Sequence, residues 1–181
     1  VDILADGSLD YPDDVLKTFD LVVASVHSRF NLGAAEQTER MIRAVSNPYV
    51  DILGHPTGRL LLTRAPYPLD LLAVIDAAAE RGVAIEINAH PQRLDLDPAG
   101  LRHGLVRGLK TSIDPDAHGT AGLLDVAYGI DTARRGWCTP GDVLNALPLP
   151  ALLAWLRHRR ERARGCAPRL PRHERRAWPS G

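Results

Sequence analysis

The chain has 181 residues, 45% of them hydrophobic, with a formal net charge of zero and two cysteines. This length and composition suit one domain with a buried core. They exclude a membrane helix, which needs roughly 18 consecutive apolar residues, and the N-terminus does not resemble a secretory signal. Two isolated cysteines indicate a reducing compartment rather than a disulfide framework, so we expect a cytoplasmic protein with no membrane contact.

The zero net charge hides an uneven distribution. Nine arginines and two glutamates lie between Arg157 and Arg176, which leaves 13 basic and 20 acidic residues elsewhere. An acidic body suits a site that collects cations. We interpret residues 163–181 as a basic tail rich in proline and arginine and predict that it is disordered. Its charge fits either a solvated chain end or an arm that contacts nucleic acid.

Apolar runs predict strands along the chain, and amphipathic stretches between them predict helices. The run at residues 1–4 indicates a strand, and because a domain rarely begins on a bare strand, we expect a segment of a longer protein. The other predicted strands cover residues 21–26, 50–53, 83–87 and 111–113. The predicted helices cover residues 15–18, 33–46, 69–81, 98–107, 121–135, 143–147 and 150–162.

Strand, polar terminus and helix thus alternate at least four times within residues 1–162. This is typical of an α/β protein with a parallel sheet, either open or closed into a barrel. The active site of such folds lies at the carboxyl ends of the strands. Potential ligands occur there after four consecutive strands: His27, His55, Asn88 with His90, and Asp116 with His118. Together they favour a metal-binding rim, although a single histidine at a strand end is more often a hydrogen-bonded turn residue.

The tripeptide Asp116-Ala117-His118 is the centre of this prediction. If it is extended, both polar side chains point the same way. A carboxylate and an imidazole offered together suit a divalent cation such as Zn²⁺ or Mn²⁺. The same pattern also occurs in turns and at helix N-caps, and that reading stays open.

Arginines follow three of the ligand-bearing strands. Arg29 comes after His27, Arg59 after His55, and Arg93 after the third strand. One arginine near a strand end is an ordinary surface residue, but three favour an anionic substrate, because the guanidinium fork matches phosphate oxygens. We therefore predict that Arg29, Arg59, Arg93 and Asn88 bind a substrate phosphate in a metal-dependent phosphoesterase.

Several of these segments resemble successive motifs of the polymerase and histidinol phosphatase (PHP) domain. The segments are residues 1–4, 25–28 (SVHS), 54–60 (GHPTGRL), 86–88 (EIN) and 116–118 (DAH). The chain resembles in particular the version at the C-terminus of bacterial family X DNA polymerases. That likeness extends through residues 129–137 (GIDTARRGW) to about residue 160.

The resemblance implies the C-terminal part of a distorted, TIM-like (β/α)7 barrel with up to three metal ions, Mn or Zn. It implies that His27 and His55 bind one metal, Asp116 a second and His118 a third. It also implies 3′–5′ exonuclease activity on DNA ends in repair, and a polymerase domain as partner within the parent chain.

The family's opening His-x-His motif and a bridging glutamate would lie before Val1, so the chain would hold only about half of the metal ligands. Two alternatives to DNA-end processing stay open. One is a stand-alone phosphatase for a small phosphate monoester, with a phosphorylated metabolite as its partner. The other is an inactive, truncated barrel with a structural role.

Overall fold

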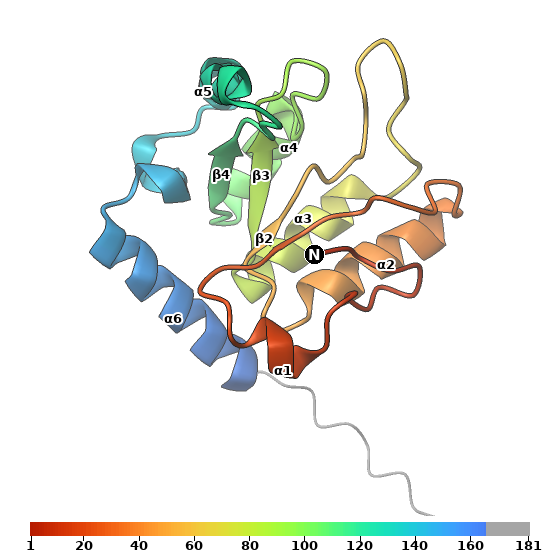
Figure 1. Cartoon of the computed structure of the whole chain (residues 1–181), viewed down its shortest axis with the longest axis vertical. Helices are drawn as coiled ribbons and strands as arrows, with labels where there is room; N and C mark the ends of the chain where they lie inside the picture. Colours follow the sequence, from red (N-terminus) through yellow and green to blue (C-terminus); the bar gives the residue numbers. More distant parts are fainter. Residues whose placement is uncertain (166–181) are drawn as a thin grey trace, which may run out of the picture.

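The computed structural model describes residues 1–165 and contains one parallel sheet with strand order β1-β2-β3-β4 (Figure 1). The strands are β1 Val23–Ala24, β2 Ile52–Leu53, β3 Ala84–Asn88 and β4 Thr111–Asp114. The predicted α/β class with a parallel sheet is therefore confirmed. Closure into a barrel remains a prediction, as does disorder of the tail from residue 166 onward, which lies outside the described residues.

The predicted opening strand is reduced to isolated bridges, a parallel one between Asp2 and Ser25 and an antiparallel one between Ile3 and Leu9. The chain turns back at once, because Gly7 takes a positive φ of 82° and the N–H of Leu4 bonds to the carbonyl of Ser8. Residues 1–4 still lie against the edge of the sheet beside β1.

Each predicted helix has a helical counterpart. The α-helices are α1 Asp13–Leu16, α2 Ala34–Val45, α3 Leu71–Arg81, α4 Pro98–Val106, α5 Val126–Arg135 and α6 Leu149–Gly165. Short 3-10 helices are η1 Thr120–Asp125, η2 Pro140–Asp142 and η3 Leu144–Ala146. Thus the predicted helix at 121–135 begins as a 3-10 segment with no buried residue to hold an α-helical turn. Helix α6 also runs three residues beyond the expected end of the folded part.

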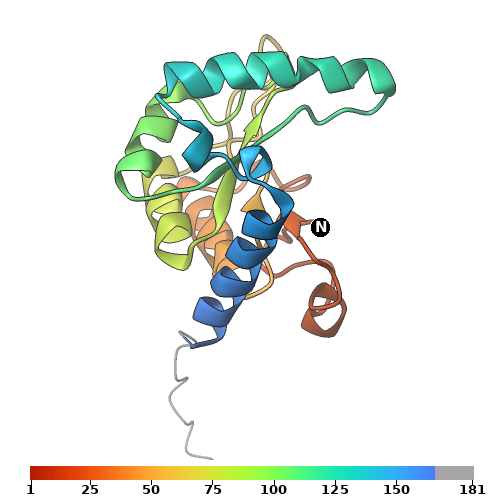
Figure 2. The same ribbon diagram turned by 90° about the vertical axis from the view of Figure 1, so that its left-hand side faces the viewer.

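The two faces of the sheet are covered by different helices. Leu53 and Ile85 belong to the larger core cluster, shared with residues of α2, α3 and α4. Ile52 and Ala84, one position earlier on the same strands, pack with Leu144 and the α6 residue Trp155. This alternation is the two-residue period of a strand buried on both faces. Figure 2 shows α5 lying across the top of the molecule, above the strands.

Helix α6 is fastened to the sheet by buried ion pairs. Arg159 donates to Asp51 Oδ1 over 2.7 Å, and Arg160 donates to Asp51 Oδ2 over 2.6 Å. Asp51 is fully buried at the start of β2 and also accepts the N–H of Val22 at 2.9 Å. The helix therefore contributes charge neutralisation as well as apolar contact.

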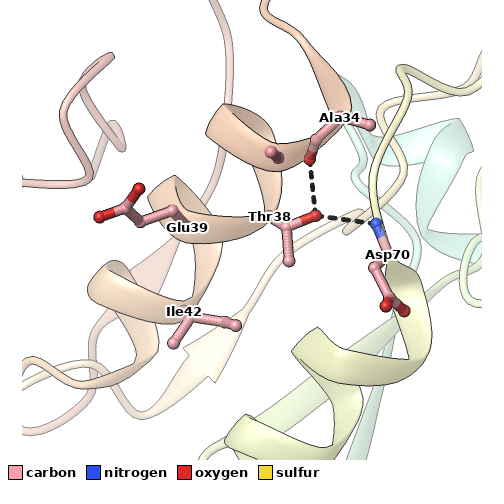
Figure 3. Close-up of a pocket in the computed structure, with 6 residues that line it drawn as sticks. Ala34, Thr38, Glu39, Ile42 and Asp70 are labelled. Carbon is pink, nitrogen blue, oxygen red and sulfur yellow. Dashed lines mark hydrogen bonds between the residues drawn. The ribbon is translucent and has the colours of Figure 1, made fainter.

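A hollow of about 470 Å³ lies between α2 and the beginning of α3 (Figure 3). Thr38 forms part of its wall and joins the two helices: its hydroxyl donates to the carbonyl of Ala34 and accepts the N–H of Asp70. None of the predicted site residues lines it: its lining is Ala34, Ala35, Thr38, Glu39, Ile42 and Asp70. Within residues 1–165, no helix combines the length and apolarity needed to cross a bilayer.

Candidate metal and phosphate site

The imidazole rings of His27 and His55 lie together just beyond the ends of β1 and β2. Their centroids are 5.1 Å apart and the ring planes make an angle of 71°. The parallel register explains this meeting, since Ala24 pairs with Leu53 and each histidine follows within three residues. The two histidines are thus neighbours although they are 28 positions apart in the sequence.

His27 is held by a carboxylate that the sequence analysis did not single out. Its Nδ1 lies 2.6 Å from Asp2 Oδ1, which favours the tautomer in which Nδ1–H donates to the carboxylate; in that neutral tautomer Nε2 carries the lone pair. The parallel bridge between Asp2 and Ser25 positions that carboxylate. A histidine with one nitrogen bound to a carboxylate and the other exposed is a common arrangement among metal ligands.

His55 is 5% exposed and its Nδ1 has no hydrogen-bond partner among the described residues. Burial lowers the pKa of His55 to about 4, and the charge of Arg93 and the ring of His27 act in the same direction. The imidazole is therefore neutral at pH 7 and can offer a lone pair to a cation. Its φ of 24° shows that the turn after β2 is strained here.

Glu86 on β3 connects the ends of the neighbouring strands. One of its oxygens, Oε2, accepts the N–H of His55 at 2.6 Å and the side-chain amide of Asn88 at 3.2 Å. Burial raises the pKa of Glu86 to about 8, and the carboxylates of Asp114 and Asp116 contribute. Its signal in the sequence was a single acidic residue inside the apolar run at 83–87.

Asn88 and Arg93 both reach the carboxylate of Asp116. The amide of Asn88 and Nε of Arg93 each donate to Asp116 Oδ2 over 3.2 Å. Asn88 is fully buried, and its Oδ1 accepts the N–H of His90. Asn88 therefore joins β3 to the segment after β4 instead of facing solvent.

The tripeptide 116–118 is not extended. The side chains of Asp116 and His118 therefore do not point the same way through strand alternation, as they would in an extended segment. Asp116 has a φ of 53°, in the left-handed region, and β4 has already ended at Asp114. The exposed ring of His118 turns back, with Nδ1 2.8 Å from the carbonyl of Asp116. In the neutral ring this contact places the lone pair on Nε2 of His118, where it could bind a cation.

The three arginines predicted to bind phosphate differ in whether their guanidinium N–H groups already have hydrogen-bond partners. Arg59 donates to the carbonyls of Arg93 and Leu94, which holds the loop after β3. Arg93 keeps a buried Nη1 without a partner in the described part of the chain. Arg29 is exposed, with a φ of 57°. Arg93 is thus the arginine with a buried, unused donor beside His55.

The donor chemistry of these histidines fits metal ligands. His27 and His118 each engage Nδ1 with an oxygen, and His55 has an unsatisfied buried nitrogen. Nevertheless, within residues 1–165 no three His, Cys, Asp or Glu side chains gather closely enough to hold an ion by themselves. The described residues fit individual ligand positions of a metal site rather than a closed set.

Comparisons with known proteins bear on what such a site does. The chain is 43% identical over 157 residues to the DNA polymerase/3'-5' exonuclease PolX of Bacillus subtilis (strain 168), covering 87% of the chain and 28% of that protein. It is 40% identical over 86 residues to a probable phosphatase of Caldanaerobacter subterraneus subsp. tengcongensis, covering 46% of the chain and 32% of that protein. A probable phosphatase of Shewanella baltica (strain OS195) is 42% identical over 85 residues, covering 46% and 31%. The aligned segment spans less than a third of each relative, and no family model matches the chain.

Proposed function

Because the chain is a PHP-type relative of bacterial family X DNA polymerases, as its motifs predicted, we propose that it contributes to a metal-dependent phosphoesterase site acting on DNA ends. The reaction would be hydrolysis of the terminal phosphodiester in the 3′–5′ direction. The observation that carries the proposal is the adjacency of His27 and His55, whose ring centroids are 5.1 Å apart. Nδ1 of His27 is bonded to Asp2, and the buried Nδ1 of His55 has no partner among the described residues.

In this proposal His27, His55, Asp116 and His118 hold Mn or Zn ions, up to three, together with ligands outside the described residues. Such ions supply a Lewis acid and a water of lowered pKa. Asp2 fixes the tautomer of His27, and the carbonyl of Asp116 fixes that of His118. The role of the chain's own residues is thus to orient the donor nitrogens.

Arg93 supplies the positive charge for the substrate in this account. Its positive charge contributes to the lowered pKa of His55, and its Nη1, which has no partner among the described residues, would donate to a phosphate oxygen. A guanidinium held by Asp116 on one side presents its remaining N–H groups in a fixed direction. Arg59 supports it indirectly, through the carbonyls of the same loop.

We further propose that these strands belong to a distorted (β/α)7 barrel and that the parent protein also carries a polymerase domain. The similarity to PolX supports both proposals, because the alignment covers 87% of the chain. The probable phosphatases support a second candidate function, hydrolysis of a small phosphate monoester. The shorter alignments to these relatives make it the second choice.

Substrate comparison separates the two candidates. The full gene product would be stripped of metal, resupplied with Mn²⁺ or Zn²⁺, and given a 5′-labelled oligonucleotide or p-nitrophenyl phosphate. We expect metal-dependent shortening of the oligonucleotide from its 3′ end. Turnover of the monoester alone would favour the phosphatase, and no turnover of either substrate with any divalent ion would contradict both.

A further inference from the structure

The loop between β2 and α3 carries a fully exposed leucine, Leu62, near its middle. Leu62 has a φ of 65°, in the region that side chains with a Cβ rarely adopt, and its neighbour Leu61 is also exposed. An exposed leucine in a strained backbone gains nothing from burial within this chain. Figure 1 shows the loop, coloured orange to yellow, rising beyond the body at the end toward which the β3 arrow points.

This loop tip is held in place by several contacts. The N–H of Leu60 donates to the carbonyl of Arg64 at 2.9 Å, and the N–H of Arg64 returns a bond of 2.7 Å. Nε and Nη2 of Arg64 donate to the carbonyl of Gly58 at 2.9 and 2.6 Å. The same guanidinium lies 4.3 Å above the ring of Phe30, which stacks on Tyr67. The tip is therefore a braced projection.

The loop is also joined to the candidate site at two points. It begins at His55, and the N–H of Leu61 donates to the carbonyl of Gln92 at 2.6 Å. Gln92 immediately precedes Arg93, whose guanidinium contacts Asp116. The tip that carries Leu62 is thus bonded to the segment of Arg93, one of the residues proposed to bind the scissile phosphate.

We propose that Leu62 contacts the base of the nucleotide next to the scissile phosphodiester and so favours nucleic acid over small phosphate esters. The proposal rests on the proposed function, because it needs a phosphate held near His55 and Arg93. Apolar side chains of nucleic-acid-binding proteins insert against bases in this way. Covering a leucine with the apolar face of a base removes both surfaces from water. A small ester has no base, so Leu62 would contribute nothing to its binding.

The test compares Leu62→Ser with Leu124→Ser, a matched change at an exposed leucine on η1. Binding of a fluorescent single-stranded oligonucleotide to the full gene product is measured by fluorescence anisotropy in EDTA. Hydrolysis of the oligonucleotide and of p-nitrophenyl phosphate is measured separately in Mn²⁺. We expect Leu62→Ser to weaken oligonucleotide binding by about tenfold. Leu62→Phe should restore it, while Leu124→Ser and all turnover of the small ester stay unchanged.

Unchanged oligonucleotide binding in Leu62→Ser would overturn the proposal. The exposed leucine would then be a candidate for contact with another protein instead. An equal loss on the small ester would also overturn it, because it would show that the loop merely supports the site. If the wild-type protein hydrolyses neither substrate, the phosphoesterase proposal fails separately. In that case the anisotropy comparison alone decides whether Leu62 contacts a base.

Discussion

The backbone N–H of His55 donates to the buried carboxylate of Glu86 over 2.6 Å, which joins the end of β2 to β3. The same oxygen accepts from Asn88, which in turn bonds to Asp116. The positions of a proposed ligand after β2 and of another after β4 therefore depend on one carboxylate. Glu86 acts as a positioning residue in this account.

Replacing Glu86 tests whether its acceptor oxygen holds the turn at His55. Glu86→Ala leaves the buried N–H of His55 without a partner, and we expect a loss of about 1–3 kcal/mol in the free energy of unfolding. Glu86→Gln keeps an acceptor oxygen and should lose less. Urea denaturation of both variants in EDTA measures the difference, and equal stability of Glu86→Ala and wild type would show that the bond does not hold the turn.

The Asp51 ion pairs predict a large effect far from the site residues. Asp51→Ala leaves Arg159 buried and unpaired, so we expect a loss of about 3–5 kcal/mol in the free energy of unfolding. Asp131→Ala is the control, because its pair with Arg134 is exposed and long at 3.7 Å, and it should cost less than about 1 kcal/mol. Similar urea midpoints for both variants would contradict the role assigned to α6.

Cys138 should resist alkylation at neutral pH. Burial raises the pKa of its thiol from the ordinary value of 9.0 to about 11, and the charge of Asp142 contributes. The unfolded thiol therefore ionises first, so this group's contribution to stability is present below pH 9 and is lost as the pH rises toward 11. The check is the rate of iodoacetamide modification against pH in a Cys166→Ser background, with the urea-unfolded chain as control. Rapid modification of the folded protein at pH 8 would contradict the burial of this thiol.

Arg93→Gln should weaken the interaction with substrate. The substitution removes the ion pair with Asp116 and the free Nη1, and a charged hydrogen bond contributes about 1.5–3 kcal/mol. We expect kcat/KM for the phosphate ester to fall by about 10- to 100-fold, mainly through KM. Arg134→Gln, an exposed arginine on α5, is the matched control. An unchanged KM in Arg93→Gln would show that this arginine has only a structural role.

The arrangement of elements was largely predictable, because apolar periodicity and the glycine and proline stops reflect local preferences and burial. His27 and His55 followed from the rule that parallel strands present their carboxyl ends at one edge. What could not be predicted depends on contacts between distant residues. Asp2 meets His27 only because residues 1–4 pair beside β1, and Thr57 donates twice to a buried Asp95, 38 positions away.

The conformation of single residues in the backbone was the second feature that could not be predicted from the sequence. Asp116, which comes directly after Pro115, has a left-handed backbone conformation, and its carboxylate contacts Asn88 and Arg93. No residue pattern in the sequence indicates this turn. The lengths of β1 and β2 were also overestimated: the apolar run at 21–26 yields only two strand residues in β1, and the run at 50–53 only two in β2. Val22 and Val26 on either side of β1 are buried outside the strand, whereas Leu21 is exposed.

Metal content is the most direct test of the central claim that His27 and His55 bind one ion together. Elemental analysis of the full gene product would be compared with a His27→Ala, His55→Ala variant and with His158→Ala, an exposed histidine on α6. The account predicts that the double variant loses about one equivalent of Mn or Zn together with hydrolysis, and that His158→Ala loses neither. Unchanged metal stoichiometry and turnover in the double variant would contradict it.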